Sequence, residues 1–125
     1  MKLFIVEDSP YIQLRLQRLL EDLPFVQVAG VAGDLQSALT GISAEVDIVL
    51  LDIQLGQENG LHLLPKILAQ QAQIKFVVLS NHASEANRML AARAGAHAFL
   101  DKSTDFNRIP ELLQAWNAAS DSSPK

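Results

Sequence analysis

The stretch that decides the fold is VDIVLLD, residues 46–52, in which four apolar residues stand in a row before a carboxylate. Such a run is too short for the buried face of a helix, but it suits a strand that is covered on both sides, as in a parallel sheet between layers of helices. The run ends at Asp52, and ligands of open α/β sheets bind just outside the carboxyl ends of the strands. We therefore expect Asp52 to be a reactive group, the alternative being that it simply begins a loop.

Composition limits the class of protein. A chain of 125 residues fits one domain with a single core, and a hydrophobic content of 49% with a charged content of 19% is typical of a soluble globular protein. The net charge of −4 argues against a nucleic-acid-binding surface. Without cysteine there are no disulfides, thiolate metal sites or cysteine nucleophiles. Neither a signal peptide nor a membrane span is predicted, so we expect a cytoplasmic protein.

The rest of the chain alternates short apolar runs with helical patterns. The predicted strands cover residues 3–6, 25–31, 47–51, 76–79 and 97–100. Predicted helices follow each strand, beginning near Ser9-Pro10, Asp34, Asn59, Ser84 and Ile109. Pro65 lies inside the third helical pattern and predicts either a kink or a later start of that helix. Gly95 is the expected stop of the fourth helix.

Five strands alternating with five helices at short connections predict βα units and a five-stranded parallel sheet. Right-handed crossovers make this an α/β, doubly wound (βα)5 sandwich with helices on both faces, in the flavodoxin-like strand order 2-1-3-4-5. We expect one domain over residues 1–119, and a flexible tail or the start of a linker over residues 120–125, which are polar and small.

Polar side chains stand at the ends of the four strands that this order places side by side. Glu7 and Asp8 follow the first strand, Asp52 the third, Ser80 the fourth and Lys102 the fifth. Each residue alone has an ordinary explanation, because acids begin loops, serine follows strands and lysine is usually a solvated charge. Together they predict three carboxylates, a hydroxyl and an ammonium around one shallow pocket.

The chemistry of such a pocket is narrow. Three neighbouring acids resist ionising together unless a cation sits among them, and an all-oxygen donor set favours a hard cation such as Mg²⁺. A magnesium ion beside Asp52 suggests phosphoryl transfer to the carboxylate, which would give an acyl phosphate. Mg²⁺, Lys102 and the Ser80 hydroxyl would then contact the oxygens of the transferring group.

These residues give the sequence a resemblance to the receiver domain of two-component response regulators, over residues 1–117. The motifs that carry it are Glu7-Asp8 after the first strand, Asp52 after IVLL, Asn59-Gly60-Leu61, Ser80 after FVVL, and Gly95-Ala96 with Phe99-Leu100-Asp101-Lys102. The resemblance implies that the protein is a signalling switch and no enzyme in the ordinary sense, although it catalyses its own phosphorylation and dephosphorylation.

The resemblance also implies roles for single residues. Asp52 would accept the phosphoryl group from a histidine kinase or a phosphotransfer protein, and Lys102 would pair with that group. Asp8 and Asp52 would bind Mg²⁺ together with the backbone carbonyl of Gln54, while Glu7 would act through water.

Ser80 and Phe99 would be the switch pair, the hydroxyl moving to the phosphoryl group and the ring turning inward behind it. For Phe99 the alternative is an ordinary core aromatic. Phosphorylation would bias two existing packings of the face formed by the fourth helix, the fifth strand and the last helix. That face would bind a downstream protein or effector domain, or a second copy in a homodimer, and would include Arg88, Met89, Arg93 and Phe99.

The sequence departs from the family pattern at several positions near the site. Leu55-Gly56 stands where proline is common, Asn81 where a small residue is usual, and Ser103 where proline is frequent. Gln54 and His82 flank the site, and we expect them to change the rate of phosphate loss. The other histidines, His62 and His97, are too scattered to form a transition-metal site with His82.

Three alternatives remain open. A phosphatase with an aspartate nucleophile would also combine Asp, Ser, Lys and Mg²⁺, but Gln54 stands where its second acid would be. A flavodoxin-like cofactor binder would need amide donors where Glu7-Asp8 places negative charge. A receiver could be a stand-alone protein or a fragment of a DNA-binding transcriptional regulator.

Overall fold

The structure is a computed structural model that describes residues 1–121, with side chains through residue 119. Its central strand, β3 (Ile48–Asp52), is buried at every position and lies between β1 (Lys2–Val6) and β6 (Lys75–Ser80). The outer strands are β2 (Gln27–Ala32) and β7 (Ala98–Asp101). All pairings in this five-stranded sheet are parallel, and the order β2-β1-β3-β6-β7 confirms the predicted topology.

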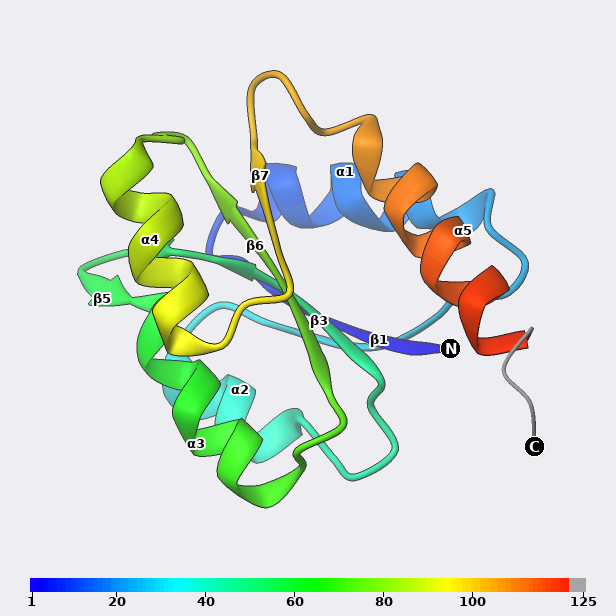
Figure 1. Ribbon diagram of the computed structural model, residues 1–125, viewed down its shortest axis with the longest axis horizontal. Coiled ribbons are helices and arrows are strands. Elements are labelled where there is room, and N and C mark those ends of the chain that lie inside the picture. The colour runs from blue at the N-terminus through cyan, green and yellow to red at the C-terminus, as the bar shows by residue number, and fades with distance from the viewer. Residues whose placement is uncertain (122–125) are drawn as a thin grey trace.

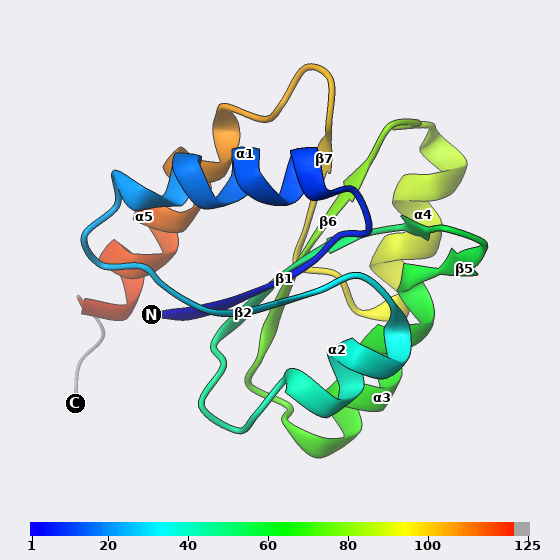
Figure 2. The ribbon, with the colours of Figure 1, turned by 180° about the vertical axis from the view of Figure 1, so that it is seen from behind.

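Helices cover both faces of the sheet. On one side lie α1 (Pro10–Glu21) and α5 (Arg108–Asp121), and on the other α2 (Leu35–Gly41), α3 (Leu63–Gln70) and α4 (Glu85–Ala94), as Figures 1 and 2 show. Successive side chains of a strand point to opposite faces, so β3 contributes to two cores. Ile48 and Leu50 pack with the α1–α5 layer, whereas Val49 and Leu51 pack with the other layer.

Three of the predicted helix starts are confirmed by their capping bonds. Ser9 Oγ accepts the Ile12 amide at 3.3 Å, Asp34 Oδ1 the Ser37 amide at 2.8 Å, and Ser84 Oγ the Asn87 amide at 3.1 Å. Each bond satisfies an amide that the first helical turn leaves unpaired. At the other end of α4, Gly95 has a φ of +108°, the left-handed conformation that commonly ends a helix.

The segment after β3 differs from the prediction. The expected loop contains a small antiparallel pair, β4 (Gln54–Leu55) and β5 (Glu58–Asn59). Asn59 then caps a 3₁₀ turn, η1 (Gly60–His62), and α3 begins only at Leu63. Pro65 therefore lies in the first turn of α3, where backbone amides have no acceptor within the helix and proline costs no hydrogen bond. Of the two predicted effects of Pro65, the structure shows the later helix start and no kink.

Some element boundaries also differ. The chain at Phe25 and Val26 forms a turn, in which the Val26 amide donates to Leu23 O at 3.1 Å, so β2 begins at Gln27. At the end of the chain, α5 continues to Asp121, and the rest of the predicted tail, residues 122–125, lies outside the described residues. No helix within residues 1–121 combines the length and the apolar character needed to cross a membrane.

Candidate functional site

The carboxyl ends of β1, β3 and β7 meet at one edge of the sheet and open into a hollow of about 330 Å³. Parallel strands all end at this edge, so residues distant in sequence become neighbours there. Five of the predicted site residues line the hollow together with Gly56 and Asn81: they are Glu7, Asp8, Asp52, Gln54 and Lys102.

The Lys102 ammonium lies between two buried carboxylates. Its Nζ donates to Asp52 Oδ2 at 3.0 Å and lies 2.7 Å from Glu7 Oε2. The three side chains are 8%, 7% and 1% exposed for Lys102, Asp52 and Glu7. Away from water these charges interact strongly, and each would be costly without a partner. All three residues belong to the predicted pocket, but the sequence predicted a contact of Lys102 with a phosphoryl group and neither of these two carboxylate contacts.

The same surroundings set the protonation of the site. Burial raises the pKa of Glu7 to about 6, a shift that the Lys102 ammonium opposes and the Asp52 carboxylate increases. Burial disfavours the charged form of Lys102, but its hydrogen bonds and ion pairs with Glu7 and Asp52 outweigh burial and raise its pKa above the ordinary value. Lys102 is therefore a fixed positive charge at neutral pH.

The acidic oxygens are close enough to share a cation. One oxygen from each of Glu7, Asp8 and Asp52 lies within 4.8 Å of the others. Glu7 Oε2 is buried and faces the Lys102 ammonium at 2.7 Å. Three hard oxygen donors this close together form a set compatible with Mg²⁺.

The two predicted switch residues lie apart from this acidic hollow. Ser80 is buried, and its hydroxyl donates to His82 O and accepts from His82 N, both at 3.0 Å. Its oxygen is thus engaged with the next loop and not with Asp52. Phe99 is only partly buried, and the guanidinium of Arg88 lies 4.9 Å from the centre of its ring. Phe99 is therefore no fully buried core aromatic.

Comparison with known proteins identifies the family. The family model described as the response regulator receiver domain matches residues 3–114. The chain belongs to this family. Membership places it in two-component signalling, where a receiver is typically a phosphoacceptor and not a classical enzyme, and where a histidine kinase is the implied partner.

Individual relatives agree with this assignment. The receiver is 34% identical over 114 residues to the transcriptional regulatory protein MalR of Bacillus subtilis, covering 90% of this chain and 48% of MalR. It is 27% identical to the chemotaxis protein CheY of Listeria monocytogenes, covering 91% of this chain and 96% of CheY. It is 28% identical to the DNA-binding transcriptional activator DevR/DosR of Mycobacterium tuberculosis, covering 81% of this chain and 47% of DevR/DosR. The receiver thus spans about half the length of several curated relatives.

Solved structures share the fold. A LuxR-family response regulator from Aurantimonas superimposes with a TM-score of 0.80 at 27% identity, covering 94% of the receiver and 83% of that chain. The isolated REC domain of RcsB from Salmonella enterica serovar Typhimurium, with phosphomimetic BeF3−, superimposes with a TM-score of 0.85 at 17% identity. The match covers 94% of the receiver and 88% of that chain. At that identity the second likeness concerns the fold alone.

Two residues near the acidic hollow had no assigned role. Gly56 has a φ of +60°, and its amide donates to Asp8 Oδ2 at 2.8 Å, so this left-handed glycine holds one of the acids. Its signal in the sequence is a glycine in the loop after Asp52. Asn81 follows Ser80 and lines the receiver's acidic hollow.

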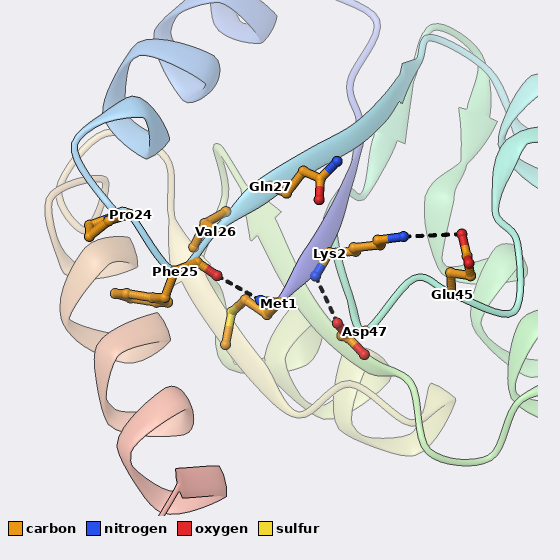
Figure 3. A pocket seen from close by; sticks show the side chains of 8 residues that line it. All are labelled: Met1, Lys2, Pro24, Phe25, Val26, Gln27, Glu45 and Asp47. Atoms are coloured by element: carbon orange, nitrogen blue, oxygen red, sulfur yellow. Dashed lines mark hydrogen bonds and ion pairs between the residues drawn. The ribbon is translucent and has the colours of Figure 1, made fainter.

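A second hollow, of about 450 Å³, lies at the opposite, amino-terminal ends of the strands (Figure 3). Its charged groups are already paired. Lys2 Nζ lies 3.1 Å from Glu45 Oε2, the Lys2 amide donates to Asp47 Oδ2 at 2.7 Å, and the Met1 amine donates to Phe25 O at 2.6 Å. Because these contacts satisfy one another, the acidic hollow and not this one is the receiver's candidate functional site.

Proposed function

We propose that Asp52 is the phosphoacceptor of this receiver. The observation that carries the proposal is the position of its carboxylate, at the end of the central strand, with Oδ2 held 3.0 Å from Lys102 Nζ and an oxygen of both Glu7 and Asp8 within 4.8 Å. A histidine kinase or a phosphotransfer protein is the proposed donor, and we propose that the exchange takes place in the cytoplasm.

The proposed step is a displacement at phosphorus. A carboxylate oxygen of Asp52 attacks the phosphorus of a donor phosphohistidine, a P–O bond forms, and the P–N bond breaks as the imidazole leaves with its electron pair. The negative charge on the phosphoryl oxygens would lie next to Asp52, where the Lys102 ammonium would stabilise it. Phosphorylation would replace the Lys102–Asp52 contact with one between Lys102 and the phosphoryl group.

Magnesium is the proposed cofactor. Asp8, Asp52 and the backbone carbonyl of Gln54 would hold it, with Glu7 acting through water. When bound, Mg²⁺ supplies positive charge that offsets both the clustered acids and the phosphoryl oxygens. The donor chemistry supports this assignment, because the cluster offers only carboxylate oxygens.

Ser80 and Phe99 are the proposed switch pair, and α4, β7 and α5 the proposed output face. On α4, the side chain of Met89 is 49% exposed and so accessible to a partner. The output face would bind a downstream protein, an effector domain or a second copy. The match to DevR/DosR, a DNA-binding transcriptional activator, supports an output through a DNA-binding module, and the match to the chemotaxis protein CheY supports an output other than transcription.

Intact mass spectrometry after incubation with Mg²⁺ and acetyl phosphate tests the acceptor. Wild type should gain about 80 Da, the mass of one phosphoryl group transferred to a carboxylate, with release of acetate. Asp52→Asn should gain nothing, whereas Asp22→Asn, the same change at an exposed acid beyond α1, should behave as wild type. A folded wild type without the gain, or a gain that survives Asp52→Asn, would refute the assignment.

The phosphatase alternative is tested in the same samples. Gln54 occupies the position of that enzyme class's second acid, and its amide cannot exchange a proton in the way a carboxyl group can. We therefore expect no turnover of a generic phosphomonoester such as p-nitrophenyl phosphate.

A further inference from the structure

Ser80 is held in its present orientation by a small network of hydrogen bonds. Its hydroxyl donates its one proton to His82 O at 3.0 Å. The same carbonyl oxygen accepts a second hydrogen bond, from Asn87 Nδ2 at 2.8 Å. Asn87 is itself fixed, because its amide is the one that Ser84 caps at the start of α4. The side chain of Asn87 therefore fixes the carbonyl group that accepts the Ser80 proton.

Phe99 has a partner on the same turn of α4. The residue after Asn87 is Arg88, whose guanidinium lies 4.9 Å from the centre of the Phe99 ring. At this distance a cation is attracted to the face of an aromatic ring. Phe99 belongs to β7, and His82 lies in the loop after the neighbouring strand β6. Two consecutive residues of α4 therefore contact β7 and the loop that follows β6.

We infer that Asn87 and Arg88 are positioning residues that hold Ser80 and Phe99 in the unphosphorylated conformation. The inference rests on the proposed function, in which the Ser80 hydroxyl moves to the phosphoryl group and the Phe99 ring turns inward. Each movement breaks one contact of the observed conformation. The Ser80 proton must leave His82 O to reach a phosphoryl oxygen, and an inward ring is no longer covered by Arg88.

Contacts made in one of two conformations set the balance between them. Because the Asn87 and Arg88 contacts exist with Ser80 and Phe99 as observed, they stabilise that conformation relative to the switched one. Removing either should raise the population of the switched conformation before any phosphoryl group arrives. If that conformation accepts the phosphoryl group more readily, the rate of uptake should rise with its population.

The test measures phosphoryl uptake from acetyl phosphate at saturating Mg²⁺ by intact mass over time. Asn87→Asp keeps the shape of the side chain but replaces the NH₂ donor with an oxygen, and Arg88→Ala removes the guanidinium. We expect each to raise the uptake rate about two- to tenfold, the factor for losing one hydrogen bond of ordinary net strength, or one cation–π contact, from one conformation. The matched controls are Asn117→Asp in α5 and Arg18→Ala at an exposed position in the last turn of α1, both expected to match wild type.

A second readout does not depend on phosphorylation. Hydrogen exchange of the His82 amide, which donates to Ser80 Oγ, should be faster in Asn87→Asp than in wild type and in Asn117→Asp. Faster exchange together with faster uptake supports the inference. Faster exchange with an uptake rate equal to that of the controls would show that the Asn87 contact is only structural, and would overturn the inference. Unchanged exchange of the His82 amide would overturn it as well. A wild type that takes up no phosphoryl group refutes the proposed function instead, and the exchange measurement alone then decides whether Asn87 holds the loop.

Discussion

At the scale of single residues, the acidic hollow is organised by one ammonium group. Lys102 contacts both Glu7 and Asp52, so it offsets part of the charge of these two buried acids, while Asp8 relies on the Gly56 amide. Three carboxylates and one ammonium leave a formal charge of minus two when all are ionised, which one divalent cation would neutralise. The charges at the site thus favour a divalent cation more than a monovalent one.

His97 gives a prediction on pH. Its Nδ1 accepts the Phe76 amide at 3.1 Å, which requires the neutral imidazole, and burial with the nearby charge of Lys75 lowers its pKa in the folded protein. The unfolded chain therefore binds a proton at higher pH than the folded one, so folding stability decreases as pH falls through the ordinary histidine pKa of about 6.5. Because the residue is largely exposed, we expect a loss of less than about 1 kcal/mol from pH 7.5 to 5.5.

Urea unfolding at the two pH values measures this loss. His97→Gln removes the titrating group, so its stability should fall less than that of wild type over the same interval. Other groups titrate equally in both proteins and cancel in the difference. His62→Gln, at an exposed position in η1, should lose as much as wild type. Equal losses in wild type and His97→Gln would contradict the prediction.

At the scale of elements, the parts of the fold that the sequence predicted are those encoded by local patterns. The strand β3 was predictable because a run of apolar residues matches burial on both faces. The helix starts were predictable because Ser9, Asp34 and Ser84 each accept an amide a few residues further on. The positions of Glu7, Asp8, Asp52 and Lys102 then followed from the strand order.

Features held by contacts between distant residues were not predictable. The hairpin β4–β5 is positioned by the Gly56 amide on Asp8 and by Glu58 Oε1, which accepts the Leu35 amide at 3.2 Å. No local pattern encodes either contact. The orientation of Ser80 was not predicted for a different reason. Its hydroxyl forms hydrogen bonds with the backbone of His82, two residues further on, and this local bonding competes with contacts to more distant groups such as Asp52.

Gly60 gives a prediction for the element after Asp52. A Cβ atom at this position would overlap the backbone carbonyl oxygen of Asp52, and the Gly60 amide donates to Ile53 O at 2.5 Å. Gly60→Ala should force the η1 turn away from β3 and lower the free energy of unfolding by about 1–3 kcal/mol, the usual cost of overpacking. Urea unfolding measures the change.

The control for Gly60 is Gly33→Ala. A Cβ there would meet its nearest atom, Asp8 Cα, at 3.7 Å, which is an ordinary contact. Its stability should stay within about 0.5 kcal/mol of wild type, as for substitutions away from special features. If the two variants lose the same stability, the close approach of Gly60 to Asp52 does not constrain the chain.

At the scale of the whole molecule, the sheet separates two helical layers that contact the site differently. The acidic hollow is lined from the α1 side by Ser9 and Ile12, whereas Asn87 and Arg88 approach the switch residues from α4 in the other layer (Figure 1). A phosphoryl group bound between the layers would therefore act on α4 through β6 and β7 while α1 remains part of the hollow's wall. Because α5 lies in the same layer as α1, the proposed output face of α4, β7 and α5 would span both layers at the β7 edge of the sheet.

The stability of the whole chain should depend on magnesium through the same acids. In metal-free buffer Glu7, Asp8 and Asp52 repel one another, so Asp8→Asn should be more stable than wild type by about 0.5–1 kcal/mol, or a melting temperature about 2–6 °C higher. Asp8 is chosen because Asp52→Asn would also disturb the contact with Lys102. Thermal unfolding in EDTA measures the difference, with Asp22→Asn as the matched control.

Adding Mg²⁺ should reverse this order. An ion that binds the folded chain stabilises it by an amount that grows with the logarithm of its concentration above the Kd, about 2.7 kcal/mol at one hundred times Kd. Wild type should gain this stability, whereas Asp8→Asn, with a proposed ligand removed, should gain much less. A variant that is no more stable than wild type in EDTA would contradict the repulsion among the acids. Equal gains in stability from Mg²⁺ in the two proteins would show that Asp8 is not a ligand of the ion, because neutralising a carboxylate that contacts Mg²⁺ lowers the affinity of the site for the ion.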